Sequence, residues 1–516
     1  MASSSDVDST LLLLFLPRTI LSPAIAAGAA LIAFALLLLF PGGVAWAFSR
    51  GKRSIPGPSG FFMPLSGSSA HRALASAAKS LGATKLMSFS VGVTRFIVSS
   101  HPETAKEILN SSAFADRPIK ESAYELLFHR AMGFAPFGDY WRNLRRISST
   151  YLFSPKRISR FGKQRMDVGV WMAGEISDFM ARDGVVEVRR VLHFGSLNNV
   201  MMTVFGKRFD FGEKDGVELE GLVKEGYELL GMFNWSDHLP LFGVFDIHGV
   251  KARCRKLVER VNVFVNQIIE DHRRKMIVCG EGVDEVDQAG DFVDVLLNLE
   301  KEEKLSDSDM VAVLWEMIFR GTDTVAILLE WIMARMVLHP DIQAKVQAEI
   351  DAVTNGNSRP VTDSDVKNLP FLQAVVKESL RMHPPGPLLS WARLAVHDVH
   401  VGDHFVPAGT TAMVNMWSIA HDAGVWSDPE EFKPERFVSE DVNILGSDLR
   451  LAPFGAGRRV CPGKTMALAT VHLWLAQLLQ KFEWAADAES GVDLSECLKM
   501  SLEMKNPLAC RAVARV

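Results

Sequence analysis

The sequence has few cysteines, no basic excess and no internal repeat. Its five cysteines in 516 residues include no CxxC pair, which excludes a disulfide framework and a zinc ribbon and favours reduced, cytosol-facing thiols. The 56 Lys and Arg residues against 61 Asp and Glu leave a net charge of −5. Because nucleic-acid-binding proteins carry a basic excess, we expect no nucleic-acid partner. With 48% hydrophobic residues, the chain is long enough to form a large core.

Charged residues are missing from Thr19 to Ser49. Within this region, the almost wholly apolar stretch Ile20–Phe40 would be about 31 Å long as a helix, the thickness of one hydrocarbon core. A cleaved signal peptide is the alternative, but the stretch is long for one and bulky Trp46 follows it. We predict an N-terminal membrane-anchor helix within residues 1–49 that crosses the membrane once. The positive-inside bias places the rest in the cytosol, because more basic residues follow the span than precede it, namely Arg50, Lys52 and Arg53.

Residues 50–65 are rich in proline and glycine, which predicts a stiff elbow between the anchor and the body. The segment Lys85–Ser99 is rich in Val, Phe and Ile around a central glycine, which predicts a hairpin of short strands. From about His101 to Lys345 the apolar spacing predicts mostly helices. Strand patterns return at Val399–Val414 and near the carboxyl terminus. The sequence therefore predicts a mainly α body with minor β-sheets.

The stretch Pro453–Gly463 places a cysteine just before an apolar helix. At such a position Cys461 receives amide donors and the positive end of the helix dipole, and both favour a thiolate ligand. Gly457 permits a tight bend, Gly463 permits close approach of a flat partner, and Arg459 supplies a donor for an anionic group. A buried, inert cysteine is the alternative, which the glycines and Arg459 disfavour. A phosphate loop is excluded, because five residues rather than four separate the two glycines. Haem meets all three requirements.

This stretch resembles the haem-binding signature FxxGxRxCxG of the cytochrome P450 monooxygenases, and the resemblance covers about residues 50 to 516. It implies the haem-thiolate monooxygenase fold, a catalytic domain over residues 66–516 and haem b (iron protoporphyrin IX) as cofactor. It also implies that the Cys461 thiolate is the iron ligand and favours cleavage of the O–O bond. The matching positions are Phe454, Gly457, Arg459, Cys461 and Gly463.

Two further groups of residues resemble motifs of this family. Trp141 and Arg145 match WxxxR, whose members contact the haem propionates, and Arg393 resembles another propionate contact. By themselves, Trp141 and Arg145 would equally suit an ordinary amphipathic helix. A second set resembles the family's Glu-Arg-Arg core lock and is expected to be structural: Glu378, Arg381 and Arg436.

A long helix is predicted from a cap near Ser306 to His339. Its interior holds Gly321-Thr322-Asp323-Thr324, where glycine alone costs about 1 kcal/mol relative to alanine. A tolerated packing irregularity is the alternative interpretation. In the resembled family this motif activates oxygen, which implies that the glycine opens space against the haem, Asp323 relays protons and Thr324 holds the bound oxygen. Arg320 stands where a small residue is usual, so it is expected to narrow the pocket or to pair with a substrate carboxylate.

The segments Gly133–Trp141 and Glu316–Gly321 resemble the 78A group of plant microsomal enzymes. The resemblance implies an endoplasmic-reticulum monooxygenase that takes electrons from NADPH through NADPH-cytochrome P450 reductase. Its substrate would be a lipophilic small molecule, such as a fatty acid or a related growth-signal precursor. We also predict that Arg142 and Arg146 face outward and steer the acidic reductase by their charge.

Two other functions are weighed against this one. A haem-thiolate isomerase or dehydratase of the same fold would need neither oxygen nor reductase, but such enzymes lack the distal alcohol that Thr324 provides. A non-catalytic haem sensor or membrane scaffold would bind the cofactor without turnover, and no residue of the sequence requires that role.

Overall fold

The structure is a computed structural model that describes residues 39–47, 55–60, 62–210, 214–239, 242–243, 246, 248–279, 290–299, 303–389, 392–488 and 491–515. The predicted anchor helix over Ile20–Phe40 lies almost entirely outside these residues, as do the basic residues that follow it. Within the described ranges, no helix is both long enough and apolar enough to cross a membrane.

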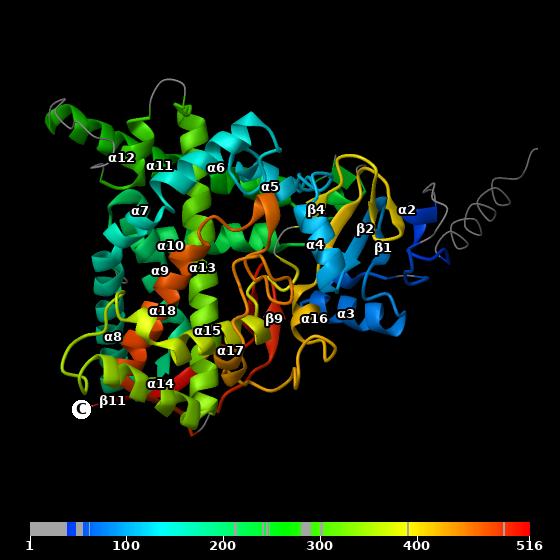
Figure 1. The fold of residues 1–516 in the computed structure, drawn as a ribbon. Coiled ribbons are helices and arrows are strands. Elements are labelled where there is room, and N and C mark those ends of the chain that lie inside the picture. The colour runs from blue at the N-terminus through cyan, green and yellow to red at the C-terminus, as the bar shows by residue number, and fades with distance from the viewer. Residues whose placement is uncertain are drawn as a thin grey trace, which may run out of the picture.

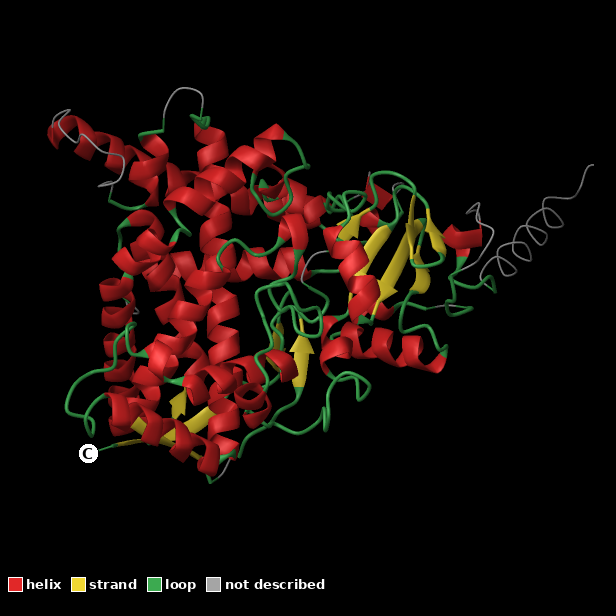
Figure 2. Cartoon of the chain, viewed as in Figure 1, coloured by secondary structure: helices red, strands yellow, loops and turns green. Residues whose placement is uncertain are grey.

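Helices make up most of the described chain (Figures 1 and 2). Their bounds are α2 (Val44–Ala47), α3 (Ala70–Ser80), α4 (Pro102–Asn110), α5 (Glu121–Glu125), α6 (Asp139–Tyr151), α7 (Pro155–Arg160), α8 (Gly162–Asp183), α9 (Val188–Phe205), α10 (Lys214–Gly231), α11 (Val250–Cys279), α12 (Phe292–Leu297), α13 (Asp307–Leu338), α14 (Pro340–Val353), α15 (Pro370–Met382), α16 (Met416–Ala420), α17 (Glu435–Ser439) and α18 (Lys464–Lys481).

The strands form small sheets, the largest of which has the order β1-β2-β7-β4. In it β2 and β7 are parallel, whereas β1 and β4 pair antiparallel with their neighbours. A second sheet has the order β3-β11-β8, and two hairpins are formed by β5 with β6 and by β9 with β10. The bounds are β1 (Met87–Val91), β2 (Thr94–Ser99), β3 (Val186–Glu187), β4 (Arg393–Leu394), β5 (Val399–Val401), β6 (His404–Val406), β7 (Thr411–Val414), β8 (Phe482–Ala486), β9 (Glu496–Leu498), β10 (Leu502–Met504) and β11 (Ala509–Ala514). The predicted mainly α architecture and the predicted hairpin at β1 and β2 are confirmed.

The chain ahead of the body packs against this first sheet. Trp46 of α2 is buried, and its indole Nε1 donates to the carbonyl oxygens of Phe89 and Phe96 at 3.0 and 3.2 Å. In the proline-rich segment, the carbonyl oxygen of Pro56 accepts from the amide of Ser88 at 2.8 Å. Both contacts fix the entry of the chain to β1 and β2, so this part of the proline-rich segment lies along the sheet.

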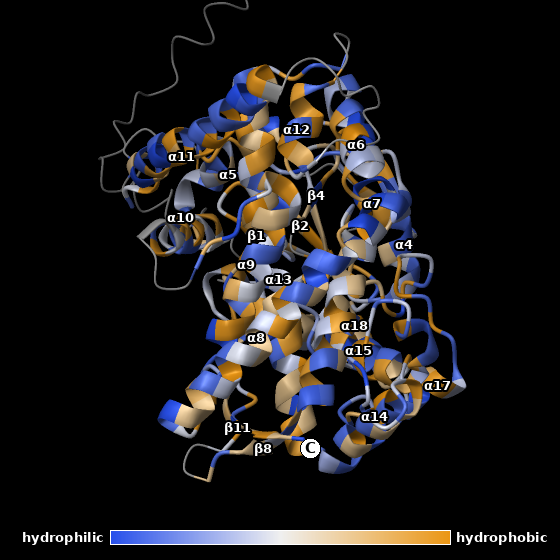
Figure 3. Cartoon of the chain, turned by 90° about the vertical axis from the view of Figure 1, so that its left-hand side faces the viewer, coloured by the Kyte–Doolittle hydropathy of each residue, from blue (hydrophilic) through white to orange (hydrophobic). Residues whose placement is uncertain are grey.

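The helix α13 runs through the middle of the helical region (Figure 1). The Ser306 hydroxyl accepts from the amide of Asp309, and the helix ends at Leu338 before Pro340; the predicted bounds are confirmed. The outer helix α11 alternates between hydrophilic and hydrophobic residues (Figure 3), whereas α13 is buried over nearly its whole length. Residues 310–319 of α13 join one apolar core and residues 325–337 join another. The segment 320–324 belongs to neither core, so a polar break separates the two.

The predicted core lock is present at the end of α15. Arg381 donates through Nε and Nη2 to the two carboxylate oxygens of Glu378 at 2.8 and 2.9 Å, and neither side chain is exposed. Arg436 Nε lies 3.2 Å from the same carboxylate. Since a buried charge left without its partner destabilises a protein by about 3–5 kcal/mol, the three side chains act as one unit. They join α15 to the segment that leads into the cysteine loop.

Candidate active site

The cysteine loop is held in shape by backbone contacts that only glycine allows. Gly457 has a φ of +67°, and a Cβ there would collide with the carbonyl oxygen of Leu109. The amide of Cys461 donates to the carbonyl oxygen of Phe454 at 2.9 Å, which closes the loop. Gly463 is the N-cap of α18. The tight bend predicted at Gly457 is therefore confirmed, and it sets the cysteine three residues before the helix.

Opposing effects act on the pKa of the Cys461 thiol. Burial raises the pKa of the Cys461 thiol, while the amide of Gly463 and the cations Arg320 and Arg145 lower it; burial outweighs them. The amide donor that the sequence predicts is present, but the protein alone does not hold the sulfur as a thiolate. A cation bound at Sγ would do so, because metal ligation displaces the thiol proton.

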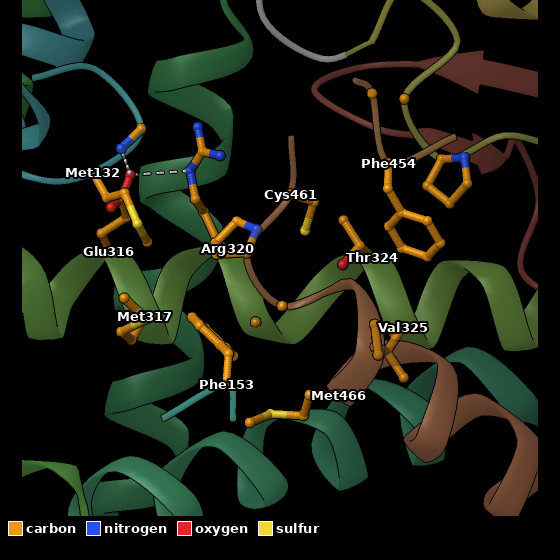
Figure 4. A pocket seen from close by; sticks show the side chains of 18 of the residues that line it. Met132, Phe153, Glu316, Met317, Arg320, Thr324, Val325, Phe454, Cys461 and Met466 are labelled. Carbon is orange, nitrogen blue, oxygen red and sulfur yellow. Dashed lines mark hydrogen bonds and ion pairs between the residues drawn. The ribbon is translucent and has the colours of Figure 1, made fainter. Parts of the chain in front are cut away.

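Cys461 opens into a cavity of about 300 Å³ between α13 and the cysteine loop. In the view of Figure 4, Arg320 and Thr324 rise from the same side of α13, and Cys461 lies between them. Thr324 is exposed although its neighbours along the helix are largely buried, which follows from its position on the cavity wall. The cavity thus places a thiol and an alcohol from distant parts of the sequence opposite a shared space. Its other walls are largely apolar and include Met317, Val325, Phe454 and Met466.

One wall of the cavity is crowded with arginines, and its only carboxylate is that of Glu316 among the described residues that line it. Burial and the charges of Arg459 and Arg145 lower the pKa of Arg393 to about 9. Its Nη1 is buried with no hydrogen-bond partner in the described part of the chain. An anion bound between guanidinium groups that repel one another in this way would stabilise them. The arginines that line this wall of the cavity are Arg117, Arg145, Arg320, Arg393 and Arg459.

The other residues of the predicted propionate site are fixed by backbone carbonyls. The Arg459 side chain is 2% exposed and donates to the carbonyl oxygens of Ala115 and Ala135 at 3.0 and 2.8 Å, and its Nη2 also lies 3.4 Å from the carboxylate of Asp116. Its guanidinium lies 4.5 Å from the centre of the Trp141 ring. The Trp141 indole donates to the carbonyl oxygen of Met132, and Arg145 donates to that of Val460 at 2.9 Å. These contacts hold the side chains on one wall of the cavity.

Arg320 has an internal partner. Its Nε lies 3.2 Å from Oε1 of Glu316, one turn earlier on α13, and Glu316 is 2% exposed. The amide of Gly133 donates to the same carboxylate at 2.7 Å. Figure 4 shows the two side chains joined above α13. Of the two predicted roles for Arg320, this pairing favours the narrowing of the pocket.

Asp323 lies outside the cavity. Its Oδ1 is 3.2 Å from Nδ1 of His193 on α9, and it is absent from the residues that line the cavity. Val200 of α9 packs closely against Gly321, since a Cβ at Gly321 would lie 2.6 Å from Cγ2 of Val200. The helix α9 therefore occupies part of the space that the glycine leaves. The predicted motif is therefore divided: Gly321 and Thr324 line the cavity, whereas Asp323 faces a neighbouring helix.

These residues fit a haem. A thiol at the mouth of a helix can ligate iron, and a wall of mutually repelling arginines suits a cofactor edge that carries two carboxylates. The orphaned Nη1 of Arg393 is the observation that most directly calls for such an anion.

Comparison with known proteins agrees with this fit. The sequence profile of the family Cytochrome P450 matches residues 60–510. The chain belongs to this family. It is 63% identical to cytochrome P450 78A5 of Arabidopsis thaliana over 95% of each chain, and 53% identical to cytochrome P450 78A6 of the same plant over 92% of this chain and 91% of that one. A zebra fish cytochrome P450, solved with abiraterone, has the same fold with a TM-score of 0.72 at 24% identity, over 86% of this chain and 99% of that one.

The chain is therefore a cytochrome P450 monooxygenase of the plant 78A subfamily. The family implies a haem-thiolate cofactor and an electron-donating reductase. The resemblance inferred from the cysteine loop and from the segments before Trp141 and Gly321 is confirmed.

Sequence reasoning missed two residues of this P450. Arg117 lines the arginine wall and donates to the carbonyl oxygens of Gly133 and Ala392. Its burial, together with the charges of Arg393 and Arg459, lowers its pKa well below the usual value. His193 was missed because nothing in α9 resembles a motif. Its only sequence signal is a polar residue on the face that packs against α13.

The cysteine loop yields a stability prediction. Gly455 and Gly457 both have positive φ, at +71° and +67°, but only Gly457 has a neighbour within reach of a new Cβ. We expect Gly455→Ala to destabilise the protein by about 1–2 kcal/mol through backbone strain alone. Gly457→Ala should lose about 1–3 kcal/mol more because Leu109 is also displaced. Urea unfolding of both variants measures the difference, and equal midpoints would contradict the close contact.

Proposed function

We propose that this P450 inserts one oxygen atom from O2 into a lipophilic substrate, using electrons that NADPH supplies through NADPH-cytochrome P450 reductase. A single N-terminal helix anchors it in the endoplasmic-reticulum membrane, with the catalytic domain in the cytosol. The observation that carries the proposal is the cavity itself, on which Cys461 and Thr324 converge from the cysteine loop and from α13.

The cofactor would be held by residues on two sides of this cavity. The Sγ atom of Cys461 would ligate the iron, and the loop around Phe454, Gly457 and Gly463 would set the position of that sulfur. When bound, the haem supplies the iron at which dioxygen is activated. The anionic edge of the cofactor would lie among the remaining side chains, Arg117, Trp141, Arg145, Arg393 and Arg459.

Thr324 and Asp323 divide the proton chemistry between two sides of α13. The Thr324 hydroxyl has no hydrogen-bond partner in the described part of the chain, so it is available to hold a proton or a bound ligand in the cavity. Asp323 would hold the next proton at its carboxylate, behind the helix. An isomerase or dehydratase needs no such relay, and the exposed hydroxyl therefore favours the monooxygenase.

Arg142 and Arg146 carry the proposed contact with the reductase. Both are more than half exposed, so the predicted outward orientation is confirmed. Arg142 pairs with Asp139 at 2.6 Å, and Arg146 pairs with Glu303. Asp139 and Glu303 cancel part of the positive charge that would steer the reductase. We propose that exposed Arg458 contributes further positive charge to this surface.

The substrate would be an amphipathic lipid such as a fatty acid or a related growth-signal precursor, because the walls near Thr324 are largely apolar. Since Glu316 already neutralises Arg320, a fatty acid and its methyl ester of equal chain length should bind with affinities that differ by less than about tenfold, or 1.4 kcal/mol. Spectral titration of the holoenzyme with both ligands measures this. A larger preference for the acid would assign Arg320 to carboxylate recognition instead.

Replacement of Cys461 tests the iron ligand. We expect Cys461→Ser to lose the long-wavelength Soret band of the ferrous carbonyl adduct, because that band requires a thiolate opposite the carbon monoxide. Cys497→Ser, which changes a half-buried cysteine of β9, is the matched control and should keep it. A Cys461→Ser protein that retains the band would show that another residue ligates the iron.

Replacement of Thr324 tests proton delivery. We expect Thr324→Ala to bind haem and consume NADPH but to release more hydrogen peroxide per product, because misdirected protonation lets peroxide escape. Thr322→Val is the control: its hydroxyl donates to the carbonyl oxygen of Ile318 at 2.7 Å, away from the cavity. Coupling that stays at the wild-type level in Thr324→Ala would remove this hydroxyl from the mechanism.

A further inference from the structure

The back of α13 carries a histidine–carboxylate pair that the cavity does not use. His193 of α9 and Asp323 of α13 approach to 3.2 Å between Nδ1 and Oδ1. The two helices are held close at this level, where the Ser196 hydroxyl donates to the carbonyl oxygen of Gly321 at 3.3 Å. Because successive residues of a helix point about 100° apart, Asp323 faces α9 while Thr324 faces the cavity.

The second ring nitrogen of His193 is not satisfied. Nε2 is buried and has no hydrogen-bond partner in the described part of the chain. Yet 29% of the His193 side chain and 15% of the Asp323 side chain remain accessible to water. A buried polar atom without a partner is costly and marks a position for a water molecule. The imidazole therefore has a carboxylate at one nitrogen and room for a water at the other.

The charges around His193 favour its protonated form. Burial would lower the pKa of His193, but the hydrogen bond and charge of Asp323, with help from Glu330, outweigh it and raise that pKa. Arg189 of the same helix acts against the rise, but it is itself paired with Glu330 at 2.8 Å. At this level α8 contributes the side chain of Met172, which packs against Gly195. Asp323 is thus the main counter-charge of His193.

We propose that His193 positions Asp323 and supplies it with protons. While both groups are charged, the ion pair holds the carboxylate on the α9 side of the helix. Transfer breaks the Nδ1–H bond and forms an Oδ1–H bond, which removes both charges and frees the neutral acid to turn toward the Thr324 side. The neutral ring keeps its Nε2–H, which donates to the water there. Once the acid has turned away, Nδ1 regains a proton from a hydronium ion of the solvent, which becomes water, and no electrons change hands. This inference rests on the proposed role of Asp323 in proton delivery.

The first test measures the pair directly, without turnover. In the ferrous carbonyl form of the full-length holoenzyme labelled with ¹³C-histidine, the His193 signal is the one that His193→Asn removes. We expect this ring to titrate above the ordinary value of about 6.5. Its pKa should fall in Asp323→Asn, because the counter-charge is lost. A His193 that titrates at or below 6.5 in the wild type would overturn the proposal.

The second test follows the pH dependence of coupled turnover with reductase. A raised pKa means that the protonated ring is present at low pH and is lost as pH rises through that pKa, so coupling should fall there in the wild type. An asparagine at position 193 can place an amide donor near the position of the histidine Nδ1, but its side chain cannot titrate. His193→Asn should therefore show no such inflection, and coupled turnover at low pH should be about tenfold lower.

The matched control is His272→Gln. His272 of α11 also pairs with a carboxylate, that of Asp291 at 2.8 Å, and its pKa is likewise raised, but it lies away from the cavity. We expect this variant to keep the wild-type pH profile. A carbonyl spectrum like that of the wild type shows that each variant has an intact haem site.

The outcomes separate the two proposals. If Asp323→Asn uncouples turnover while His193→Asn keeps the wild-type profile, only the role of His193 is overturned. If Asp323→Asn also keeps wild-type coupling, the proposed function of Asp323 fails together with this inference. A His193→Asn protein that loses the inflection, beside an unchanged His272→Gln protein, supports both.

Discussion

The active site depends on a short polar interruption in a helix that is otherwise buried over nearly its whole length. On either side of residues 320–324, α13 belongs to a different apolar core. A polar side chain in such a position is costly unless it finds a partner. Arg320 has Glu316, Thr322 has the carbonyl oxygen of Ile318, and Asp323 has His193. Thr324 alone is left without one, and this places the only uncommitted hydroxyl of the segment in the cavity.

A second constraint acts on the arginine wall of the cavity. Distant segments of the chain bring several arginines together there, and their charges repel one another. Backbone carbonyl oxygens accept hydrogen bonds from Arg117, Arg393 and Arg459 and hold each side chain in place. Such contacts fix the guanidinium positions, and Asp116, whose carboxylate lies 3.4 Å from Nη2 of Arg459, offsets only part of their charge. The wall is therefore built in advance for an anion, and ion pairing with a carboxylate-bearing cofactor would offset both the burial and the repulsion that lower their pKa values.

Local chemistry made part of this structure predictable. The cap at Ser306, the stop at Pro340 and the bend at Gly457 depend on neighbouring residues, and the sequence shows them directly. The direction of Asp323 and the packing of Val200 on Gly321 could not be predicted in the same way, since they depend on which helix lies behind α13. The same holds for Arg146, whose partner Glu303 is far along the chain, and for Arg117, whose burial arises only when separate segments meet.

The helix α9 shows why the two sides of α13 can be altered separately. His193, Ser196 and Val200 are spaced by three and four residues, so they lie along one face of α9, and each contacts the segment from Gly321 to Asp323. Val200 reaches past the glycine to the cavity, whereas His193 does not line it. Substitutions on the cavity side would therefore change which substrates fit. Substitutions at His193, about two turns earlier on α9, would change the proposed proton supply while leaving the shape of the pocket intact.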